Sequence, residues 1–328
     1  MRLLFVGDVM LGRLVNRELR RRPPEYPWGD TLPVFKEADL RFCNLECAVS
    51  DRGRPWSATP KAFHFRTDAG NIEALKAADI NAVSLANNHT LDFGYEALED
   101  TLEILDKAGI ARAGAGKDIE EASSPAYLIL SGKKIAFVAF TDNEPWWEAG
   151  QGQPGIFYVP VDTKDWRARL LFEKVKEAQR KADLVVVSAH WGPNWGYRPA
   201  LEHIPFGHAL VEAGAGVVFG HSCHVFQGIE VYKGSPIIYS SGDFIDDYAV
   251  AEIERNDESF IFSAEFEESR FTGMALIPTV ITGFKAELAP SPRAELISAK
   301  MKNLCSEFNT STEWPEDEKR LKILLGRG

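Results

Sequence analysis

The segment Arg2-Leu3-Leu4-Phe5-Val6-Gly7-Asp8, near the N-terminus, sets the pattern on which the expected fold depends. Its short apolar run is typical of a strand that is buried on both faces of a sheet. Similar apolar or nearly apolar runs recur at residues 40–44, 82–85, 184–188 and 217–219. Amphipathic stretches that favour helices lie at residues 71–77, 95–107, 164–181 and 204–213. Because strands alternate with helices, the sequence predicts βαβ crossovers and a partly parallel sheet.

Other segments favour antiparallel pairing, and the C-terminal end favours helices. The expected antiparallel pairs are residues 127–130 with 135–140, 229–232 with 237–239, and 259–266 with 274–281. Residues 294–308 and 315–325 are expected to be helices, since Pro315 suits a first helical turn and the acidic residues after it favour the helix N-terminus. We therefore expect an α/β fold, with one layered domain over residues 1–288 and a C-terminal helical extension, residues 289–328, packed on it.

The composition is that of an ordinary globular protein with a surplus of acidic residues. The chain has 328 residues, of which 37 are Lys or Arg and 48 are Asp or Glu, and its formal net charge is −11. Nucleic acid and anionic membranes need cationic contacts, so neither is expected as a partner. Four cysteines do not make a disulfide framework and favour a reducing compartment. Since we find neither a secretory signal pattern nor an apolar stretch of about 18 residues, we expect a cytoplasmic protein without a membrane anchor.

The polar residues that follow the predicted buried strands are of metal-ligand types. In an open α/β sheet the carboxyl ends of the strands form the edge at which ligands bind. Each residue alone has an ordinary explanation, such as a turn, a helix cap or a buried hydrogen bond. Together they predict a site for divalent metal ions, because carboxylate, amide oxygen and imidazole are the groups that such ions take as ligands. The residues are Asp8, Glu46, Asn88, His89, His190, His221 and His224.

Seven motifs carry a family resemblance, in this order along the chain. They are GDVMLGR (7–13), NLE (44–46), FHFR (63–66), SLANNHTLDFG (84–94), GAG (114–116), HWG (190–192) and GHSCHVFQ (220–227). Over about residues 1–248 the chain resembles the CapA family, which is named for a poly-γ-glutamate capsule biosynthesis protein. That family belongs to the calcineurin-like metallophosphoesterase superfamily.

The resemblance implies a four-layer α/β/β/α sandwich of the metallo-dependent phosphatase type, with two divalent metal ions (Mn, Fe or Zn) at the strand ends. The ligands that it implies are Asp8 and His224 for the first metal, Asn88, His190 and His221 for the second, and Glu46 as the bridge. His89 would protonate a leaving group, with Asp92 orienting it. The two metals would activate a water molecule and neutralise charge on the group that it attacks.

The chain departs from the family pattern at positions that bear on these expectations. Met10 stands where the superfamily has a metal-binding histidine, and a thioether is a poor ligand for Mn²⁺ or Mg²⁺. We therefore expect the first metal site to be weak or empty. Asn194 replaces a glutamate of the family, Asp243 replaces an asparagine and Cys223 replaces a proline. These changes predict a substrate preference different from that of the capsule proteins.

Substrate-binding roles are expected for four residues, each with an alternative. Arg13 and Arg66 could bind a phosphate or carboxylate in a bidentate manner, or each could pair with a structural aspartate. Trp191 and Trp195 could line a pocket for a flat or sugar-like group, or they could pack in the core.

Three functions are compatible with the sequence. The first is a metal-dependent hydrolase that uses metal-activated water on a phosphoester or related bond. The second is a capsule-type protein that assists poly-γ-glutamate synthesis or export without hydrolysis. The third is a metal-containing binding module without turnover. In each case the expected partner is an anionic small molecule or polymer, of the phosphoester or γ-glutamyl type.

Overall fold

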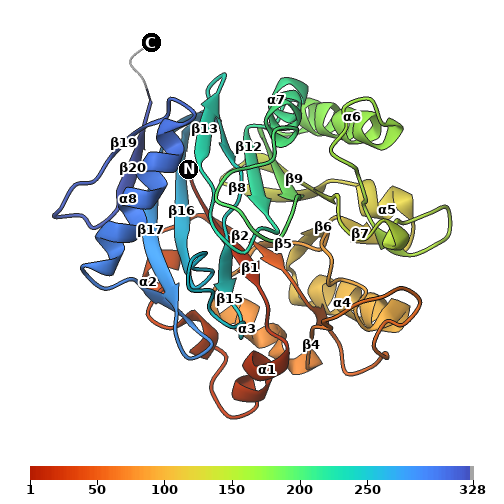
Figure 1. The fold of residues 1–328 in the computed structure, drawn as a ribbon. Helices are drawn as coiled ribbons and strands as arrows, with labels where there is room; N and C mark the ends of the chain where they lie inside the picture. The colour runs from red at the N-terminus through yellow and green to blue at the C-terminus, as the bar shows by residue number, and fades with distance from the viewer. Residues whose placement is uncertain (326–328) are drawn as a thin grey trace.

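Two β-sheets stacked face to face form the centre of the computed structural model, which describes residues 1–325 (Figure 1). In spatial order, the first sheet contains β19 (Ser311–Glu313), β20 (Leu321–Leu324), β17 (Arg270–Ile281), β16 (Glu258–Glu267), β1 (Arg2–Val9), β2 (Leu40–Leu45), β5 (Ala82–Ser84) and β6 (Ala111–Ala113). Two further strands join this path, β15 (Asp243–Ile245) beside β1 and β18 (Ala286–Leu288) beside β17. The second sheet contains β13 (Ile229–Tyr232), β14 (Ser235–Ile238), β12 (Val217–His221), β11 (Leu184–His190), β9 (Lys133–Thr141) and β8 (Ala126–Leu130).

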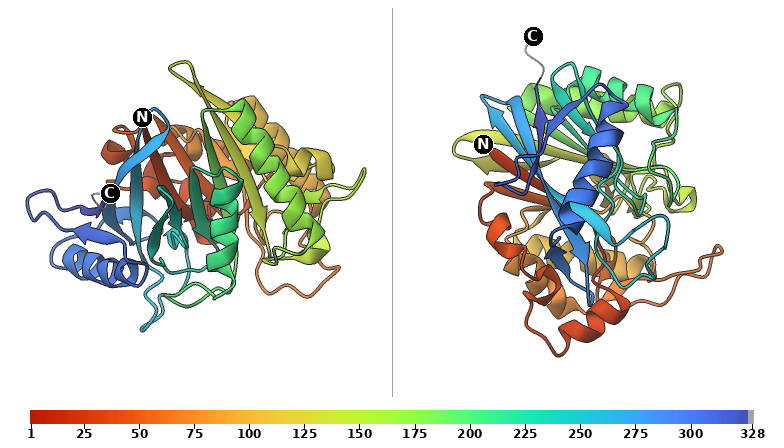
Figure 2. Two further views of the ribbon diagram at one scale, coloured as in Figure 1. Left: turned by 90° about the horizontal axis from the view of Figure 1, so that it is seen from above. Right: turned by 60° about the vertical axis from the view of Figure 1, so that its left-hand side comes forward.

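Helices cover the outer faces of both sheets. The first sheet is covered by α1 (Arg13–Leu19), α2 (Leu32–Phe35), α3 (Ile72–Ala77) and α4 (Gly94–Ala108). The second is covered by α5 (Ile119–Ser123), α6 (Trp166–Lys181) and α7 (His203–Ala213). Figure 2 shows α6 and α7 (green) on one side of the molecule and α8 (Arg293–Ser306, blue) on another, where its buried side chains join the apolar cluster between the two sheets. Among the described residues, no helix is both long enough and apolar enough to cross a membrane.

Short elements complete the secondary structure. Two small pairs of strands lie outside the main sheets, β3 (Ala48–Val49) with β4 (Arg66–Thr67) and β7 (Ala115–Gly116) with β10 (Gly155–Ile156). The short 3₁₀ helices are η1 (Tyr26–Trp28), η2 (Ala69–Asn71) and η3 (Pro145–Trp147).

The apolar side chains form three separate clusters, one for each contact between layers. Successive side chains of a strand point to opposite faces, so Leu3 and Phe5 of β1 pack between the two sheets, whereas Leu4 and Val6 pack under the helices. A third cluster lies between the second sheet and α5 to α7. This arrangement confirms the predicted α/β fold with four layers in the order α/β/β/α. Because both faces of the central strands are covered, their sequences are continuous apolar runs and do not alternate with polar residues.

The predicted strands and helices of the domain are confirmed with small differences at their ends. All five apolar runs are strands, and the three antiparallel pairs form as β8–β9, β13–β14 and β16–β17. The sequence did not single out α1, α2 and α5, which are only four to seven residues long and show too few turns for a clear period.

The prediction of a wholly helical C-terminal extension is wrong. The first helix forms as α8, but β20 occupies the second predicted helix and pairs antiparallel with β17, Leu321 facing Leu276. Leu321 and Ile323 are two residues apart, so both point between the sheets and are buried there. That burial and the pairing with β17 outweigh the local helix signals at Pro315. Residues 326–328 of the extension lie outside the described residues.

Parallel pairing brings the carboxyl ends of the ligand-bearing strands to one edge. In the first sheet, Asp8 of β1 is paired with Asn44 of β2 and with Asp243 of β15. In the second sheet, His190 of β11 is paired with His221 of β12. The two sheets therefore present their polar strand ends on the same side of the molecule, as predicted from the polar residues that follow each buried strand.

We predict that β20 contributes substantially to the stability of the sheet. Leu321→Ala should lower the free energy of unfolding by about 2–5 kcal/mol, because it leaves a cavity between the two sheets. Leu324→Ala, in the same strand at a half-exposed position, should change it by less than about 0.5 kcal/mol. Urea unfolding followed by fluorescence measures both values. Equal, small effects of the two substitutions would show that β20 is not part of the folded sheet.

Candidate metal centre

Asp8 lies at the carboxyl end of β1 and is held there by two buried amides. The Asn44 side-chain amide donates a hydrogen bond to Asp8 Oδ1 at 2.7 Å, and Asn87 in turn donates to Asn44 Oδ1 at 2.9 Å. Gly7 allows β1 to approach the chain at Gly242, since a Cβ on Gly7 would lie 1.7 Å from the Gly242 carbonyl oxygen. Asp8 is only 1% exposed, and within residues 1–325 its Oδ2 atom has no hydrogen-bond partner. The side chain is thus fixed in orientation while one oxygen remains available to a ligand.

Two histidines from the second sheet meet Asp8. The Nδ1 atoms of His190 and His221 are 2.9 Å apart, and His221 Nδ1 is 3.6 Å from Asp8 Oδ1. Ser188 Oγ is 2.6 Å from His221 Nε2, and Asn88 Oδ1 is 3.0 Å from His190 Nε2. Burial lowers the pKa of His190 and lowers that of His221 to about 3, so both rings are neutral. The neutral ring is the form that binds a metal ion.

These three residues form the first of two groups that could hold a metal ion. Asp8, His190 and His221 each offer a ligand atom, and the three atoms lie within 4.8 Å of one another. The second group is Asp8, His224 and Asp243, under the same criterion. The two groups therefore share Asp8.

Glu46 lies nearby but belongs to neither group in the part of the chain that the structure describes. It is buried, and the Tyr248 hydroxyl donates a weak hydrogen bond to Glu46 Oε2 at 3.4 Å. Asp8 is the residue common to both groups, whereas Glu46 was predicted to bridge the two metals. The bridging role of Glu46 stays a prediction.

Four carboxyl groups are buried together at the centre. Burial raises the pKa values of Asp8, Glu46, Asp243 and Asp246, and the neighbouring carboxylates raise them further. Among the described residues, the Oδ2 atoms of Asp8, Asp243 and Asp246 lack hydrogen-bond partners. Buried charges are costly unless they are paired or bind metals. Both the unpartnered oxygens and the oxygen and imidazole donors fit a divalent cation.

Met10 does not contribute to the centre as a histidine would. It is fully buried, and its sulfur accepts a hydrogen bond from the Gly12 backbone N–H at 3.0 Å. The thioether therefore has a structural role in the turn that leads from β1 into α1.

His89 and Asp92 form a close pair beside the centre. His89 Nδ1 is 2.5 Å from Asp92 Oδ2, and the same oxygen accepts a hydrogen bond from the Phe65 backbone N–H at 2.6 Å. The His89 ring stacks on the Phe65 ring with a centroid distance of 3.9 Å. Burial, followed by the charge of Lys61, lowers the pKa of His89. With Nδ1 occupied by Asp92, the atom left for a bound molecule is Nε2.

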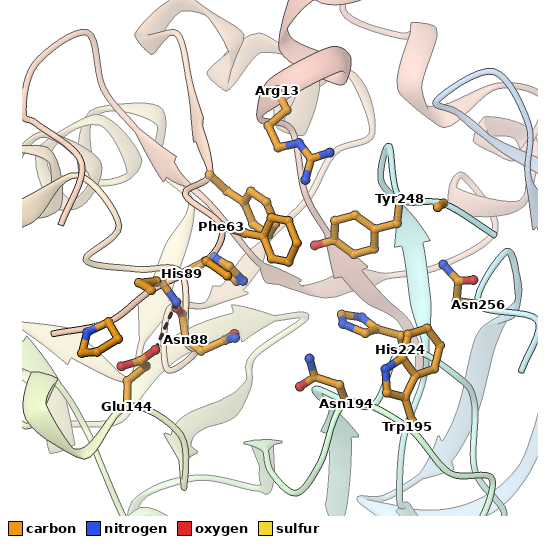
Figure 3. A pocket seen from close by; sticks show the side chains of 15 residues that line it. Arg13, Phe63, Asn88, His89, Glu144, Asn194, Trp195, His224, Tyr248 and Asn256 are labelled. Atoms are coloured by element: carbon orange, nitrogen blue, oxygen red, sulfur yellow. Dashed lines mark hydrogen bonds and ion pairs between the residues drawn. The ribbon is translucent and has the colours of Figure 1, made fainter. Parts of the chain in front are cut away.

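A cleft of about 570 Å³ lies over these residues (Figure 3). His89, Asn88 and His224 line it, so the centre and the cleft belong together. Figure 3 shows Arg13 and Tyr248 entering from one side, opposite Asn194 and Trp195. Of the predicted substrate-binding residues, Arg13 and Trp195 line this cleft.

Arg13 is held in place on the cleft wall. Its Nε atom is 3.2 Å from Asp247 Oδ2, and its guanidinium lies 5.7 Å and 5.5 Å from the rings of Phe63 and Phe65. The residue has φ +50°, a conformation that is uncommon for side chains other than glycine. Arg13 therefore lies where it could contact a substrate, and it also pairs with a structural aspartate, which was the alternative role considered for it.

Arg66 and Trp191 lie away from the described lining of the cleft. Arg66 donates hydrogen bonds to the carbonyls of Arg52 and Gly53, at 2.6 Å and 3.2 Å. Trp191 is buried, stacks on His203 and donates to the Tyr239 carbonyl at 2.8 Å. Trp191 therefore follows its structural alternative, whereas Arg66 bonds backbone carbonyls instead of the aspartate that its alternative named. A direct role in substrate binding has no geometric support for either residue.

Lys61 and Tyr248 are site residues that the sequence reasoning missed. The Lys61 ammonium is 2.5 Å from the Asn88 carbonyl, 3.1 Å from Glu144 and 3.4 Å from Asp92. Its side chain is 6% exposed. Lys61 lies in a loop without periodic pattern, so no local signal marked it. Tyr248 lies shortly after Asp243 in the sequence. The acidic residues between them, Asp246 and Asp247, were the only local signal that this segment belongs to the site.

The fold and the site together define an α/β sandwich protein with a candidate centre for divalent metal ions at the strand ends. The family described as bacterial capsule synthesis protein PGA_cap matches residues 2–248, which include every residue of both groups. The chain therefore belongs to this family of bacterial capsule synthesis proteins, as the resemblance to CapA predicted.

Relatives of known name agree with this assignment, and one solved structure shares the fold. The chain is 35% identical to a probable polyglutamine synthesis accessory protein of Mycobacterium tuberculosis, over 75% of this chain and 74% of that protein. It is 31% identical to the PGA biosynthesis protein CapA of Bacillus subtilis, over 74% of this chain and 62% of that protein. It is 27% identical to the capsule biosynthesis protein CapA of Bacillus anthracis, over 98% of this chain and 77% of that protein. A hypothetical protein from Thermus thermophilus shares the fold, with a TM-score of 0.51 and 18% identity over 88% of this chain and 100% of that one.

We predict that Lys61 stabilises the walls of the cleft. Lys61→Met keeps the aliphatic stem beside the Trp147 ring but removes the charge between Asp92 and Glu144. Because it breaks a buried pair by removing one partner, it should lower the free energy of unfolding by about 3–5 kcal/mol. Lys76→Met, which breaks the exposed pair with Glu73, should have no measurable effect. Chemical denaturation of both variants checks this, and a neutral result for Lys61→Met would contradict the buried network.

Proposed function

We propose that the protein is a metal-dependent hydrolase that acts on a phosphoester or related bond of an anionic substrate. The observation that supports this most is the group of Asp8, His190 and His221, whose ligand atoms lie within 4.8 Å of one another. The group is buried, and His190 contacts Asn88, which lines the cleft. Asn88 Oδ1 lies 3.0 Å from His190 Nε2 and would orient the ring so that Nδ1 faces the cation, and the ligand role predicted for Asn88 stays a prediction. A bound divalent cation lowers the pKa of a coordinated water and neutralises charge on the group under attack.

The residues around the cation would bind and orient the substrate. His89 would pass a proton to the leaving group through Nε2, while Asp92, whose pKa burial raises to about 7, binds Nδ1 and can hold the proton of that contact. The stacking of His89 on Phe65 prevents the ring from turning away. Arg13 would bind an anionic group of the substrate at the outer end of the cleft. Trp195, which is 42% exposed, would contact its less polar part.

The net charge of −11 does not prevent the binding of an anion, because the local charge differs from the average. Arg13 and Lys61 line the cleft, each paired with a carboxylate, and a divalent cation would supply positive charge beyond these pairs. An anionic substrate would therefore be attracted to the cleft even though the whole chain is acidic.

A role in capsule formation is the second candidate function. Family membership and the names of the relatives favour a γ-glutamyl polymer as the bound molecule, with or without hydrolysis. The same cleft would bind it, because carboxylate groups along such a polymer suit Arg13 and a metal ion alike. A metal-containing binding module without turnover is the third candidate. A cytoplasmic location stays a prediction.

We predict that the protein binds a divalent cation through His221. Mn²⁺ or Zn²⁺ at about 100 times its dissociation constant should stabilise the protein by about 2.7 kcal/mol, and a chelator should reverse this. His221→Ala should lose the bound metal and the stabilisation. His208→Ala, which removes a histidine bonded to Glu230 far from the cleft, should retain both. Elemental analysis and thermal unfolding measure these effects. Identical unfolding of chelated and metal-supplemented wild type would reject a metal centre.

We predict that His89 acts in turnover and not in metal binding. His89→Ala should keep the metal content of the wild type and lower kcat by about 10²–10⁴-fold, since it removes the proton donor. The substrates to compare are a phosphomonoester, a phosphodiester and a γ-glutamyl polymer. Turnover of the polymer alone would favour the capsule function over the phosphoesterase. A wild type that binds metal but turns over none of the three substrates would favour the third candidate, a metal-containing binding module without turnover.

A further inference from the structure

We propose that Lys300 of α8 is a positioning residue for the cleft. Through the hydroxyl of Tyr197, it holds the wall that Trp195 and Asn256 form, although Lys300 lies outside the described lining of the cleft. Its expected effect on substrate binding rests on the proposed function, whereas its effect on the position of the wall does not. A helix outside the matched residues 2–248 would thus determine how one wall of the cleft is placed.

Three charged side chains lie on one face of α8. Arg293, Lys300 and Glu307, which directly follows the helix, are spaced seven residues apart, so each lies about two helical turns from the next. The neighbouring face is apolar, and Ile297 and Met301 are buried there between the two sheets. The apolar face therefore fixes α8 in the fold, and the charged face is left to bind other segments.

Lys300 binds the loop that joins β11 to α7. Its ammonium donates a hydrogen bond to the Tyr197 hydroxyl at 3.1 Å and lies 4.6 Å from the centre of the same ring. The ammonium is also 3.1 Å from Glu258 Oε2, at the start of β16. Only one residue separates Tyr197 from Trp195, which lines the cleft. The contact at Tyr197 therefore limits where Trp195 can lie.

The same hydroxyl holds a second loop, which joins β15 to β16. The Tyr197 hydroxyl accepts a hydrogen bond from the Arg255 backbone N–H at 3.1 Å. The next residue, Asn256, is 1% exposed and lines the cleft. Figure 3 shows Asn256 and Trp195 on the same side of the cleft, across from His89. One hydroxyl thus joins α8 to both loops of this wall.

Salt bridges at the two ends of α8 add to this arrangement. Arg198, in the first loop, forms a bidentate pair with Glu307, with both contacts at 2.7 Å. In the second loop, Asp257 accepts a hydrogen bond from Arg293 Nη2 at 2.6 Å. The pair of Arg198 with Glu307 is exposed to solvent, so its contribution is small. Lys300 lies between these pairs and, unlike them, contacts the hydroxyl that both loops share.

A purely structural role is the alternative, in which Lys300 only stabilises the packing of α8. Lys300→Met keeps an aliphatic stem beside the aromatic ring and removes the charge and the hydrogen bonds. Tyr197→Phe removes only the shared hydroxyl, and Lys300→Arg restores a charged donor. If both residues act through one contact, the effects of Lys300→Met and Tyr197→Phe should not add in the double variant. Lys302→Met, which changes an exposed lysine of the same helix, is the control.

The experiment is ¹⁹F nuclear magnetic resonance of protein labelled with 5-fluorotryptophan, in which single Trp→Phe variants assign the signals. Lys300→Met and Tyr197→Phe should shift or broaden the Trp195 signal, and the double variant should change it no further. Lys300→Arg and Lys302→Met should match the wild type. The signal of Trp28, buried in a different apolar cluster, should stay in place and shows that the variants are folded. A Trp195 signal that Lys300→Met leaves unchanged, or that Lys302→Met changes equally, would overturn the inference.

Turnover of p-nitrophenyl phosphate with Mn²⁺ tests the consequence for substrate binding. Lys300→Met should raise KM by about 2–10-fold, the factor that the loss of one hydrogen bond accounts for, and leave kcat unchanged. This split is expected because the wall binds the substrate, while His89 and the metal ligands are not altered. A fall in kcat with an unaltered KM would contradict the positioning role. A wild type without phosphoester turnover would count against the proposed function, and the Trp195 signal alone would then decide the inference.

Discussion

The burial of Asp8 with one unpartnered carboxylate oxygen is the constraint on which the site depends. Asn44 fixes one oxygen of Asp8, and the other faces a group of histidines and carboxylates with no partner among the described residues. Leaving such a charge uncompensated in a protein interior costs several kcal/mol. A divalent cation relieves that cost, and it uses the neutral imidazoles of His190 and His221 as further ligands.

The four-layer fold brings these groups together from distant parts of the chain. Asp8, Asn44 and Asp243 come from three strands of one sheet, whereas His190 and His221 come from two strands of the other. Because the sheets pack through a common apolar layer, the relative position of the two sets is rigid. The cleft then adds Arg13, His89 and Trp195 from loops and a short helix, the usual place for groups that select a substrate.

Much of this could be predicted from the sequence, and the failures have physical causes. The buried strands were evident from apolar runs, and Asp8, His190, His221 and His224 follow those runs directly. The helix predicted at 315–325 failed because Leu321 and Ile323 gain more by pairing with β17 than local charges can offset. Lys61 and the pairing of Asp243 with Asp8 depend on contacts between segments far apart in sequence, which no local pattern reveals.

The most direct test of the central claim is a crystal structure of the protein grown with Mn²⁺, using anomalous scattering to locate the ions. If Asp8 binds a cation, an anomalous peak should lie within bonding distance of Asp8, His190 and His221. Any second peak should also lie within bonding distance of Asp8. Direct bonding contacts between the peak and a nitrogen or oxygen atom would identify true ligands. Water or an empty position beside Asp8 at saturating Mn²⁺ would contradict the account.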